Sequence, residues 1–101
     1  MTIVYNSVFD KQIIDIVNYI ALDKPSASIK FALELEEAIL DIPYFPFKYK
    51  ESIYFNDKNV RDMTYKGYTI IYEVNLDNNT IEILKIFNQN KPLRDSRYNK
   101  A

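Results

Sequence analysis

Residues 59–88, NVRDMTYKGYTIIYEVNLDNNTIEILKIFN, contain the strongest structural pattern in this sequence. Three runs rich in Val, Ile, Tyr and Thr are separated by two turn signals, which is typical of a three-stranded antiparallel meander. Lys66-Gly67 forms the first turn and contains the only glycine of the chain, at a position where a positive φ is expected. Asp77-Asn78-Asn79 forms the second turn, from residue types that tolerate left-handed backbone.

Alternation along the two later runs predicts which side chains share a face of the sheet. The middle run divides into two sets: Tyr68, Ile70, Tyr72 and Val74 on one face, Thr69, Ile71 and Glu73 on the other. The last run is apolar on both faces, with Ile81 and Ile83 on one and Leu84 and Ile86 on the other. A strand that is apolar on both faces is usually central in a sheet or covered on both sides.

Two helices are predicted before the meander, after a short β-prone run at residues 2–5. Ser7 is expected to cap the first helix, over about residues 7–22. Pro25 suits the first turn of a second helix, which is predicted to end at Ile42. Each helix has one apolar stripe. We therefore expect an α+β fold with an N-terminal strand, a two-helix hairpin and a three-stranded antiparallel meander, the helices lying on one face of the sheet.

Two further segments complete the chain, which at 101 residues is expected to form a single domain, residues 1–101. Residues 43–58 combine two prolines with six aromatic residues and are predicted to form a loop that its rings pin to the core. Residues 89–101 are predicted to form a polar, basic tail. The charged residues of this tail are Lys91, Arg94, Asp95, Arg97 and Lys100.

The composition excludes several classes of function. The chain has no cysteine and no histidine, so disulfides, thiolate metal sites and Ser-His or Cys-His nucleophiles are excluded, and no metal or cofactor is predicted. A formal net charge of -1 disfavours direct binding to nucleic acid. No run approaches the ~18 apolar residues of a membrane span, and the N-terminus lacks a signal-peptide pattern. A cytoplasmic protein without a membrane partner is expected.

The order of strand, helix hairpin, aromatic and proline-rich loop and meander resembles the RelE/ParE superfamily of toxins from bacterial type II toxin–antitoxin systems. The matching segments are Asp23-Lys24-Pro25-Ser26-Ala27, Val60-Arg61-Asp62-Met63, residues 66–74 and residues 81–86. The resemblance covers about residues 2–90 and depends on the order and spacing of these segments. It implies a cognate antitoxin as partner, with operator DNA bound only through that antitoxin.

The superfamily contains two activities, and this chain is more similar to one of them. RelE-like members cut messenger RNA on the ribosome with a cluster of Lys, Arg and a C-terminal Tyr. The resemblance places those cations at positions that are not cationic here: Val60, Asp62, Thr69 and residues 88–90. ParE-like members inhibit DNA gyrase by protein binding and commonly have Val-Arg-Glu-Leu at residues 60–63. We therefore expect a ParE-like gyrase inhibitor with no catalytic residues.

Two alternatives remain open at this stage. One is a RelE-like mRNA endoribonuclease with a rearranged site, in which Tyr98 would stand for the C-terminal tyrosine. The other is a non-toxic co-repressor that binds the antitoxin.

Two sets of candidate partner-binding residues follow. The first contains five of the cations in residues 43–101 and the tyrosine that follows the last of them: Arg61, Lys85, Lys91, Arg94, Arg97 and Tyr98. For Arg61 an ion pair with Asp62 or Glu34 is favoured over a functional role, although Glu34 itself is assigned to a solvated helix face. The second set is an antitoxin groove on the sheet face away from the helices, where partly covered apolar side chains are expected: Ile71, Leu84 and Ile86.

Overall fold

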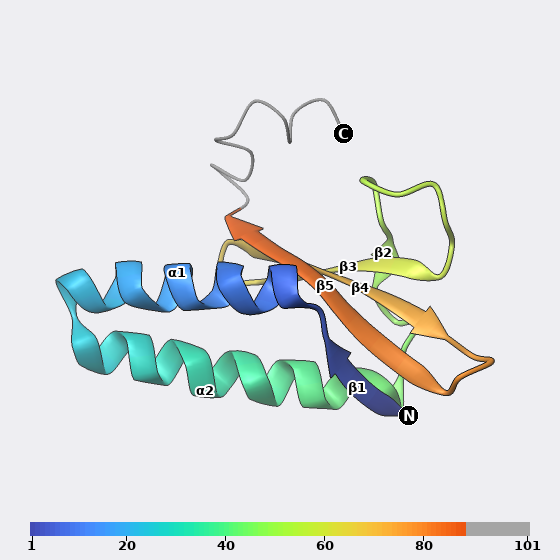
Figure 1. Ribbon diagram of the computed structural model, residues 1–101, viewed down its shortest axis with the longest axis horizontal. Coiled ribbons are helices and arrows are strands. Elements are labelled where there is room, and N and C mark those ends of the chain that lie inside the picture. The colour runs from blue at the N-terminus through green and yellow to red at the C-terminus, as the bar shows by residue number, and fades with distance from the viewer. Residues whose placement is uncertain (89–101) are drawn as a thin grey trace.

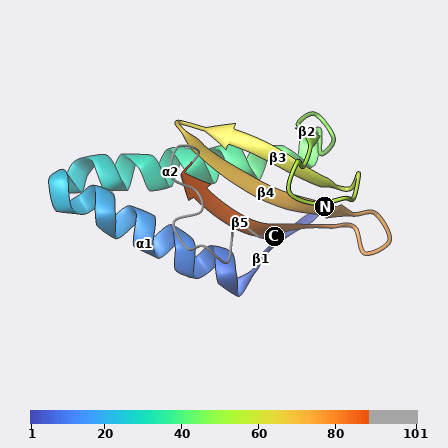
Figure 2. The ribbon, with the colours of Figure 1, turned by 90° about the horizontal axis from the view of Figure 1, so that it is seen from above.

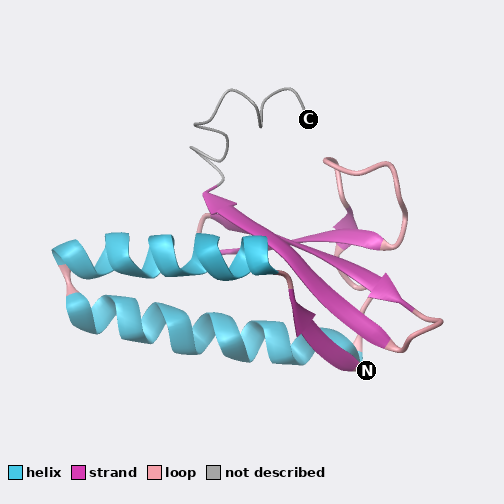
Figure 3. Cartoon of the chain, in the orientation of Figure 1, coloured by secondary structure: helices cyan, strands magenta, loops and turns pink. Residues whose placement is uncertain are grey.

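The computed structural model describes residues 1–88, and the predicted basic tail lies outside the described residues. The elements are β1 (Thr2–Tyr5), α1 (Ser7–Asp23), α2 (Pro25–Asp41), the 3-10 turn η1 (Ile42–Tyr44), β2 (Lys50–Glu51), β3 (Val60–Tyr65), β4 (Tyr68–Asn75) and β5 (Thr80–Asn88). Figures 1 and 3 show the helices and strands segregated into two layers. The predicted α+β fold is confirmed.

Within residues 1–88 the strands form one five-stranded sheet in the order β1-β5-β4-β3-β2. β3, β4 and β5 are the predicted antiparallel meander. β1 adds to β5 in parallel, so β5 is internal to the sheet, as its apolar residues on both faces indicated. β2 pairs antiparallel with β3, in a segment that was predicted to be entirely loop.

Both turns of the meander have the left-handed backbone expected of them. In the β3–β4 turn φ is 47° at Lys66 and 84° at Gly67. Two consecutive positive φ values are the mark of the type I′ turn, whose twist matches that of the strands it joins. In the β4–β5 turn the residue with positive φ is Asn79, at 57°. The only glycine of the chain therefore lies where its conformational freedom is needed.

The two helices lie side by side and antiparallel on one face of the sheet (Figure 2). The prediction of Ser7 as the N-cap of α1 was wrong by one residue: Asn6 is extended, and its side chain accepts a hydrogen bond of 2.8 Å from the Val8 N–H. Pro25 opens α2 as expected, since the first turn needs no N–H from that residue. Neither helix of the described chain is long and apolar enough to cross a membrane.

The main core lies between the helix hairpin and this helix-covered face. The helices contribute Phe9, Phe31, Leu35 and Ile39, and the strands contribute Met63, Ile70, Tyr72, Val74, Ile81, Ile83 and Ile86. The Phe31 ring centroid lies 5.9 Å from that of Tyr65 and 5.2 Å from that of Tyr68. These tyrosines are therefore part of the core packing.

A β-bulge in β5 changes which of its side chains face the helices. Ile71 of β4 pairs with Lys85 and the next residue, Tyr72, pairs with Ile83, so Leu84 is an extra residue in β5. An inserted residue reverses the alternation beyond it. Ile86 consequently joins Ile83 in the main core, and the prediction that Ile86 shares a face with Leu84 was wrong.

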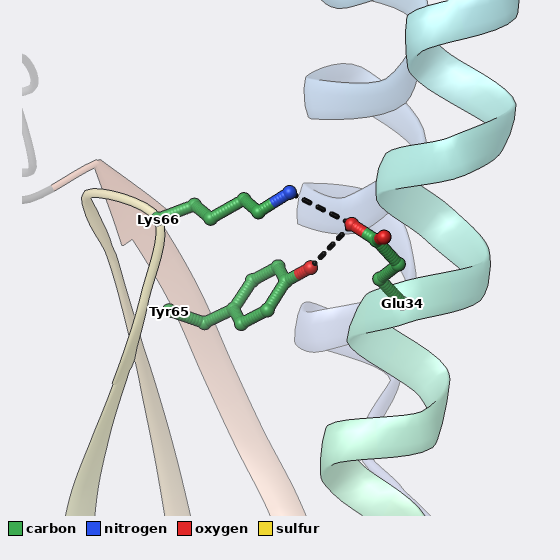
Figure 4. A network of polar contacts seen from close by, with 3 residues as sticks. All are labelled: Glu34, Tyr65 and Lys66. Atoms are coloured by element: carbon green, nitrogen blue, oxygen red, sulfur yellow. Dashed lines mark hydrogen bonds and ion pairs between the residues drawn. The ribbon is translucent and has the colours of Figure 1, made fainter.

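The β3–β4 turn is attached to α2 by a small polar network (Figure 4). The Lys66 ammonium lies 2.7 Å from Glu34 Oε1, and the Tyr65 hydroxyl donates to the same oxygen over 3.1 Å. Glu34 thus has two partners on the β3–β4 turn, while its side chain remains 37% exposed. The hydrogen bond from Lys66, with a smaller contribution from Tyr65, lowers the pKa of the Glu34 carboxyl below its ordinary value.

Because folding lowers this pKa, the network contributes its full stabilisation at pH values above the ordinary pKa of a glutamate. The contribution is lost as the pH falls through the folded-state pKa. We expect Glu34→Gln to lower the melting temperature slightly at about pH 7, and to have a progressively smaller effect as the pH falls through the lowered pKa of the Glu34 carboxyl. The measurement is thermal unfolding of both proteins across this range. Glu37→Gln, at an exposed position of the same helix, is the control. If the melting temperatures of the two variants depended on pH in the same way, the stabilising role assigned to the Glu34 network would be wrong.

Candidate partner-binding surfaces

The sheet face opposite the helices, called here the second sheet face, has a small apolar cluster of its own. Val60, Ile71 and Phe87 are buried in it, and Leu84 packs against them half-buried. The Tyr54 ring meets that of Phe87 edge-on, with 5.2 Å between centroids. The loop between β2 and β3 therefore covers part of this face.

This arrangement corrects the predicted antitoxin groove. Ile71 and Ile86 are each 1% exposed, so neither is the partly covered residue that was expected. Ile86 in addition lies on the opposite face, because of the bulge. Leu84 is the one member that is half-buried on the second sheet face. A role for these residues in antitoxin binding stays a prediction.

Arg61 holds the irregular segment in place. Its Nε donates to the Lys58 carbonyl over 2.9 Å, and its Nη1 donates to the carbonyls of Tyr49 over 3.0 Å and Phe47 over 3.4 Å. The guanidinium carbon also lies 4.9 Å from the centre of the Phe47 ring. The predicted partners, Asp62 and Glu34, are not those observed. The guanidinium is planar and has several donors in fixed directions, so this one side chain satisfies carbonyls on both arms of the loop.

Tyr72 makes a second attachment to the same segment. Its ring is completely buried in the main core, while its hydroxyl donates a hydrogen bond of 2.6 Å to the Pro46 carbonyl. Burial raises the pKa of the Tyr72 phenol far above its ordinary value, and Tyr49 adds to the rise. The hydroxyl thus remains a donor across the physiological range. Tyr49 and Tyr72 also pack edge-on, 6.4 Å between centroids.

The segment held by Arg61 and Tyr72 exposes many large apolar side chains, which we call the ring surface. Its members are Tyr44, Phe45, Phe47, Ile53, Tyr54 and Phe55, exposed between 37% and 75%. The prediction that the rings pin this segment to the core therefore holds for Tyr49 and not for most of the others. Tyr44 also borders a groove between β1 and the end of α2, with Ile3 and Leu40 in its walls. Large exposed aromatic side chains are enriched among the residues that contribute most to protein-binding surfaces.

Of the remaining residues in the predicted cationic set, only Lys85 lies within residues 1–88. Lys85 lies on β5 opposite Ile71, half-buried. Lys91, Arg94, Arg97 and Tyr98 lie outside the described residues.

Asp62 is the second charged residue of β3 and is only 3% exposed. Its Oδ2 accepts a hydrogen bond of 3.1 Å from the Ile53 N–H. Its Oδ1 is buried and has no hydrogen-bond partner among residues 1–88. Asp62 pairs across the ladder with Ile71, so its carboxylate adjoins the apolar cluster of the second sheet face.

Comparison with known proteins identifies the family. The family model described as the ParE toxin of the type II toxin–antitoxin system parDE matches residues 3–92. The chain belongs to the ParE toxin family. A solved structure of the chromosomal ParDE toxin–antitoxin system from P. aeruginosa has the same fold, with a TM-score of 0.70 at 16% identity, over 87% of this chain and 95% of that one. Comparison with curated proteins finds no match.

Membership of the ParE family confirms the resemblance stated from the sequence. Two features of this ParE chain were missed there. The rings of residues 43–58 were predicted to pin this segment to the core, because aromatic content alone does not show which rings are buried and which are exposed. Asp62 was considered as an ion-pair partner for Arg61 and as a non-cationic residue at a RelE-like position, and its burial with one unpaired oxygen was not predicted. In a strand these two side chains point to opposite faces.

The structural role of Arg61 leads to a test. We expect Arg61→Lys to lower the free energy of unfolding by about 1–3 kcal/mol, because one ammonium cannot replace a fork that reaches three carbonyls. Urea unfolding gives the stability, and limited proteolysis within residues 43–58 reports the release of the loop. Lys58→Ala, at an exposed position in the same loop, is the control. If Arg61→Lys were as stable and as protease-resistant as the wild type, other contacts would have to hold the loop.

Proposed function

We propose that this ParE-family protein inhibits DNA gyrase by protein–protein binding, and that a cognate antitoxin neutralises it. The family description places the chain in a toxin–antitoxin system, which makes an antitoxin the expected partner. The choice of gyrase as target is supported by the similarity of residues 60–63 to the ParE branch. It is supported further by the unsuitability of the second sheet face for RNA cleavage.

The observation that carries this proposal is the burial of the positions at which RelE-like enzymes concentrate cations. Val60, Asp62 and Thr69 are 3%, 3% and 4% exposed. Cleavage of a phosphodiester without metal or histidine needs several cations around one phosphate, to stabilise the charge that develops in the transition state. Here the corresponding positions carry an apolar side chain, a carboxylate and a hydroxyl. Asp62 would repel the phosphate.

The ring surface is the part of the chain that best suits a protein target. Tyr, Phe and Ile side chains contribute large contact areas, and Arg61 and Tyr72 fix the backbone that presents them. A surface that is already ordered loses less conformational entropy on binding. In this proposal Arg61 acts as a positioning residue for the rings and does not itself touch the target. Lys85 stays a candidate contact.

The proposal is tested by pairing a gyrase supercoiling assay with a translation-coupled RNA cleavage assay. We expect the purified protein to inhibit supercoiling and to leave ribosome-bound messages intact. Phe45→Ser, on the ring surface, should weaken inhibition at least about tenfold, the usual effect of removing a ring at the centre of an interface. Tyr19→Ser, an exposed ring on α1, is the matched control and should inhibit normally.

Two results would overturn the proposal. Codon-positioned cuts with unimpaired supercoiling would move the chain to the RNase branch. Absence of both activities, with the antitoxin still bound, would favour the non-toxic co-repressor.

A further inference from the structure

The α2 helix has a second apolar stripe, on the side away from the main core. Ile29, Leu33 and Leu40 are 62%, 57% and 54% exposed, while the same helix buries a separate set of apolar side chains against the sheet. The three exposed residues follow one another at intervals of four and seven, which places them on one side of the helix. A surface helix normally has a single apolar stripe and a polar opposite face. The second stripe of α2 therefore differs from an ordinary solvated helix face.

The charges beside this stripe are divided between the two halves of α2. Lys30 lies in the N-terminal half, and Glu37 and Asp41 lie in the C-terminal half, all three exposed. Their spacing of seven and four residues places them together on one flank of the stripe. Within residues 1–88 none of the three forms an ion pair. A helix with a cation before its midpoint and acids after it is complementary to an antiparallel copy of itself.

We propose that two copies of this chain associate through the outer side of α2, with the two α2 helices antiparallel about a twofold axis. In the register whose centre lies between Leu33 and Glu36, Ile29 of each copy is opposite Leu40 of the other copy. Leu33 then lies beside the axis, against Leu33 and the aliphatic carbons of Glu36 in the other copy. The three exposed apolar residues of each helix are thus covered by one contact.

The same register brings opposite charges together on the flank of the contact. Lys30 of each copy lies two residues, or about 3 Å along the helix axis, from both Glu37 and Asp41 of the other copy. In an antiparallel helix pair the residues of one flank meet the same flank of the partner, so these charges are neighbours. Twofold symmetry repeats the arrangement, which gives two equivalent charge clusters per dimer.

This charge division favours a second copy over an unrelated partner. A twofold interface requires a surface that is complementary to itself, and the α2 stripe meets this requirement in its apolar residues and in its charges. The antiparallel arrangement also opposes the two helix macrodipoles favourably. Glu36 limits the affinity, because it approaches Glu36 of the other copy on the second flank. One pair of 17-residue helices also provides less contact than a standard interface of about 1,600 Å². We therefore expect a dimer that exchanges with monomer.

The inference is independent of the gyrase proposal. The contact uses none of the residues of the ring surface, and the assembly state can be measured without gyrase. Loss of dimerisation with inhibition intact would disprove only the pairing of α2. A dimer without inhibition would leave this pairing intact and disprove the gyrase proposal.

Sedimentation equilibrium of the full-length chain tests the apolar part of the contact. We expect a concentration-dependent equilibrium between monomer and dimer for the wild type. Leu33→Ser should raise the dimer Kd at least about tenfold, because a side chain is lost from the centre of the interface on both copies. Leu22→Ser, an equally exposed leucine at the closed end of the helix hairpin, is the matched control and should leave the Kd unchanged.

A charge exchange tests the register and keeps the proposal falsifiable if Leu33→Ser does not fold. Lys30→Glu and Glu37→Lys should each raise the Kd about tenfold, because each places like charges together twice per dimer. The double variant should recover most of the wild-type affinity. Lys11→Glu, at an exposed position of α1, makes the same change in net charge and is the control.

Three results would overturn the proposal. The first is a wild-type chain that is monomeric at all concentrations up to about millimolar. The second is a dimer that Leu33→Ser and Lys30→Glu leave intact, which would place the interface elsewhere. The third is a charge exchange that does not restore association, which would exclude the antiparallel register.

Discussion

The packing of the helix hairpin against one face of β4 and β5 is the interaction on which the rest of this structure depends. Ile70, Tyr72 and Val74 of β4 are at most 1% exposed, and each such side chain contributes about 1.5–3 kcal/mol through burial. Tyr72 belongs both to this core and to the hydrogen bond with Pro46. The ring surface is therefore positioned by the same strand that organises the core, and a change in core packing would be transmitted to it.

The bulge in β5 is the second feature on which the structure depends, because it determines which side chains of that strand lie on each face of the sheet. Because Leu84 is an extra residue in β5, Ile81, Ile83 and Ile86 all face the helices. Phe87 still lies on the second sheet face. A regular strand would place either Ile83 or Ile86 on the wrong side. The bulge also leaves the Ile86 N–H to be satisfied from outside the sheet, and the Gln12 side chain of α1 accepts it over 2.9 Å. One inserted residue thus specifies both faces and ties the first helix to the sheet.

Features that depend on the local sequence pattern could be predicted from the sequence. Features that depend on contacts between distant residues could not. Alternation, helical periodicity, Gly67 and Pro25 gave the elements and their order, because each reflects the backbone preferences of single residues. The bulge at Leu84 was not visible, because an apolar run reads the same with or without an inserted residue. The carbonyl partners of Arg61 and the unpaired oxygen of Asp62 depend on where the 43–58 segment crosses the sheet, which spacing cannot provide.

Among the described residues, the closed end of the helix hairpin reaches past the end of the sheet (Figure 1). Leu22 there is 87% exposed, and the nearby Tyr19 and Ile29 are also exposed. Stability within a protein is uneven, and segments with little buried surface open without the rest. The closed end of the helix hairpin can open and close locally while β4, β5 and the ring surface keep their geometry. Substitutions and short insertions at this end would then be tolerated better than in β4 and β5, which hold the core.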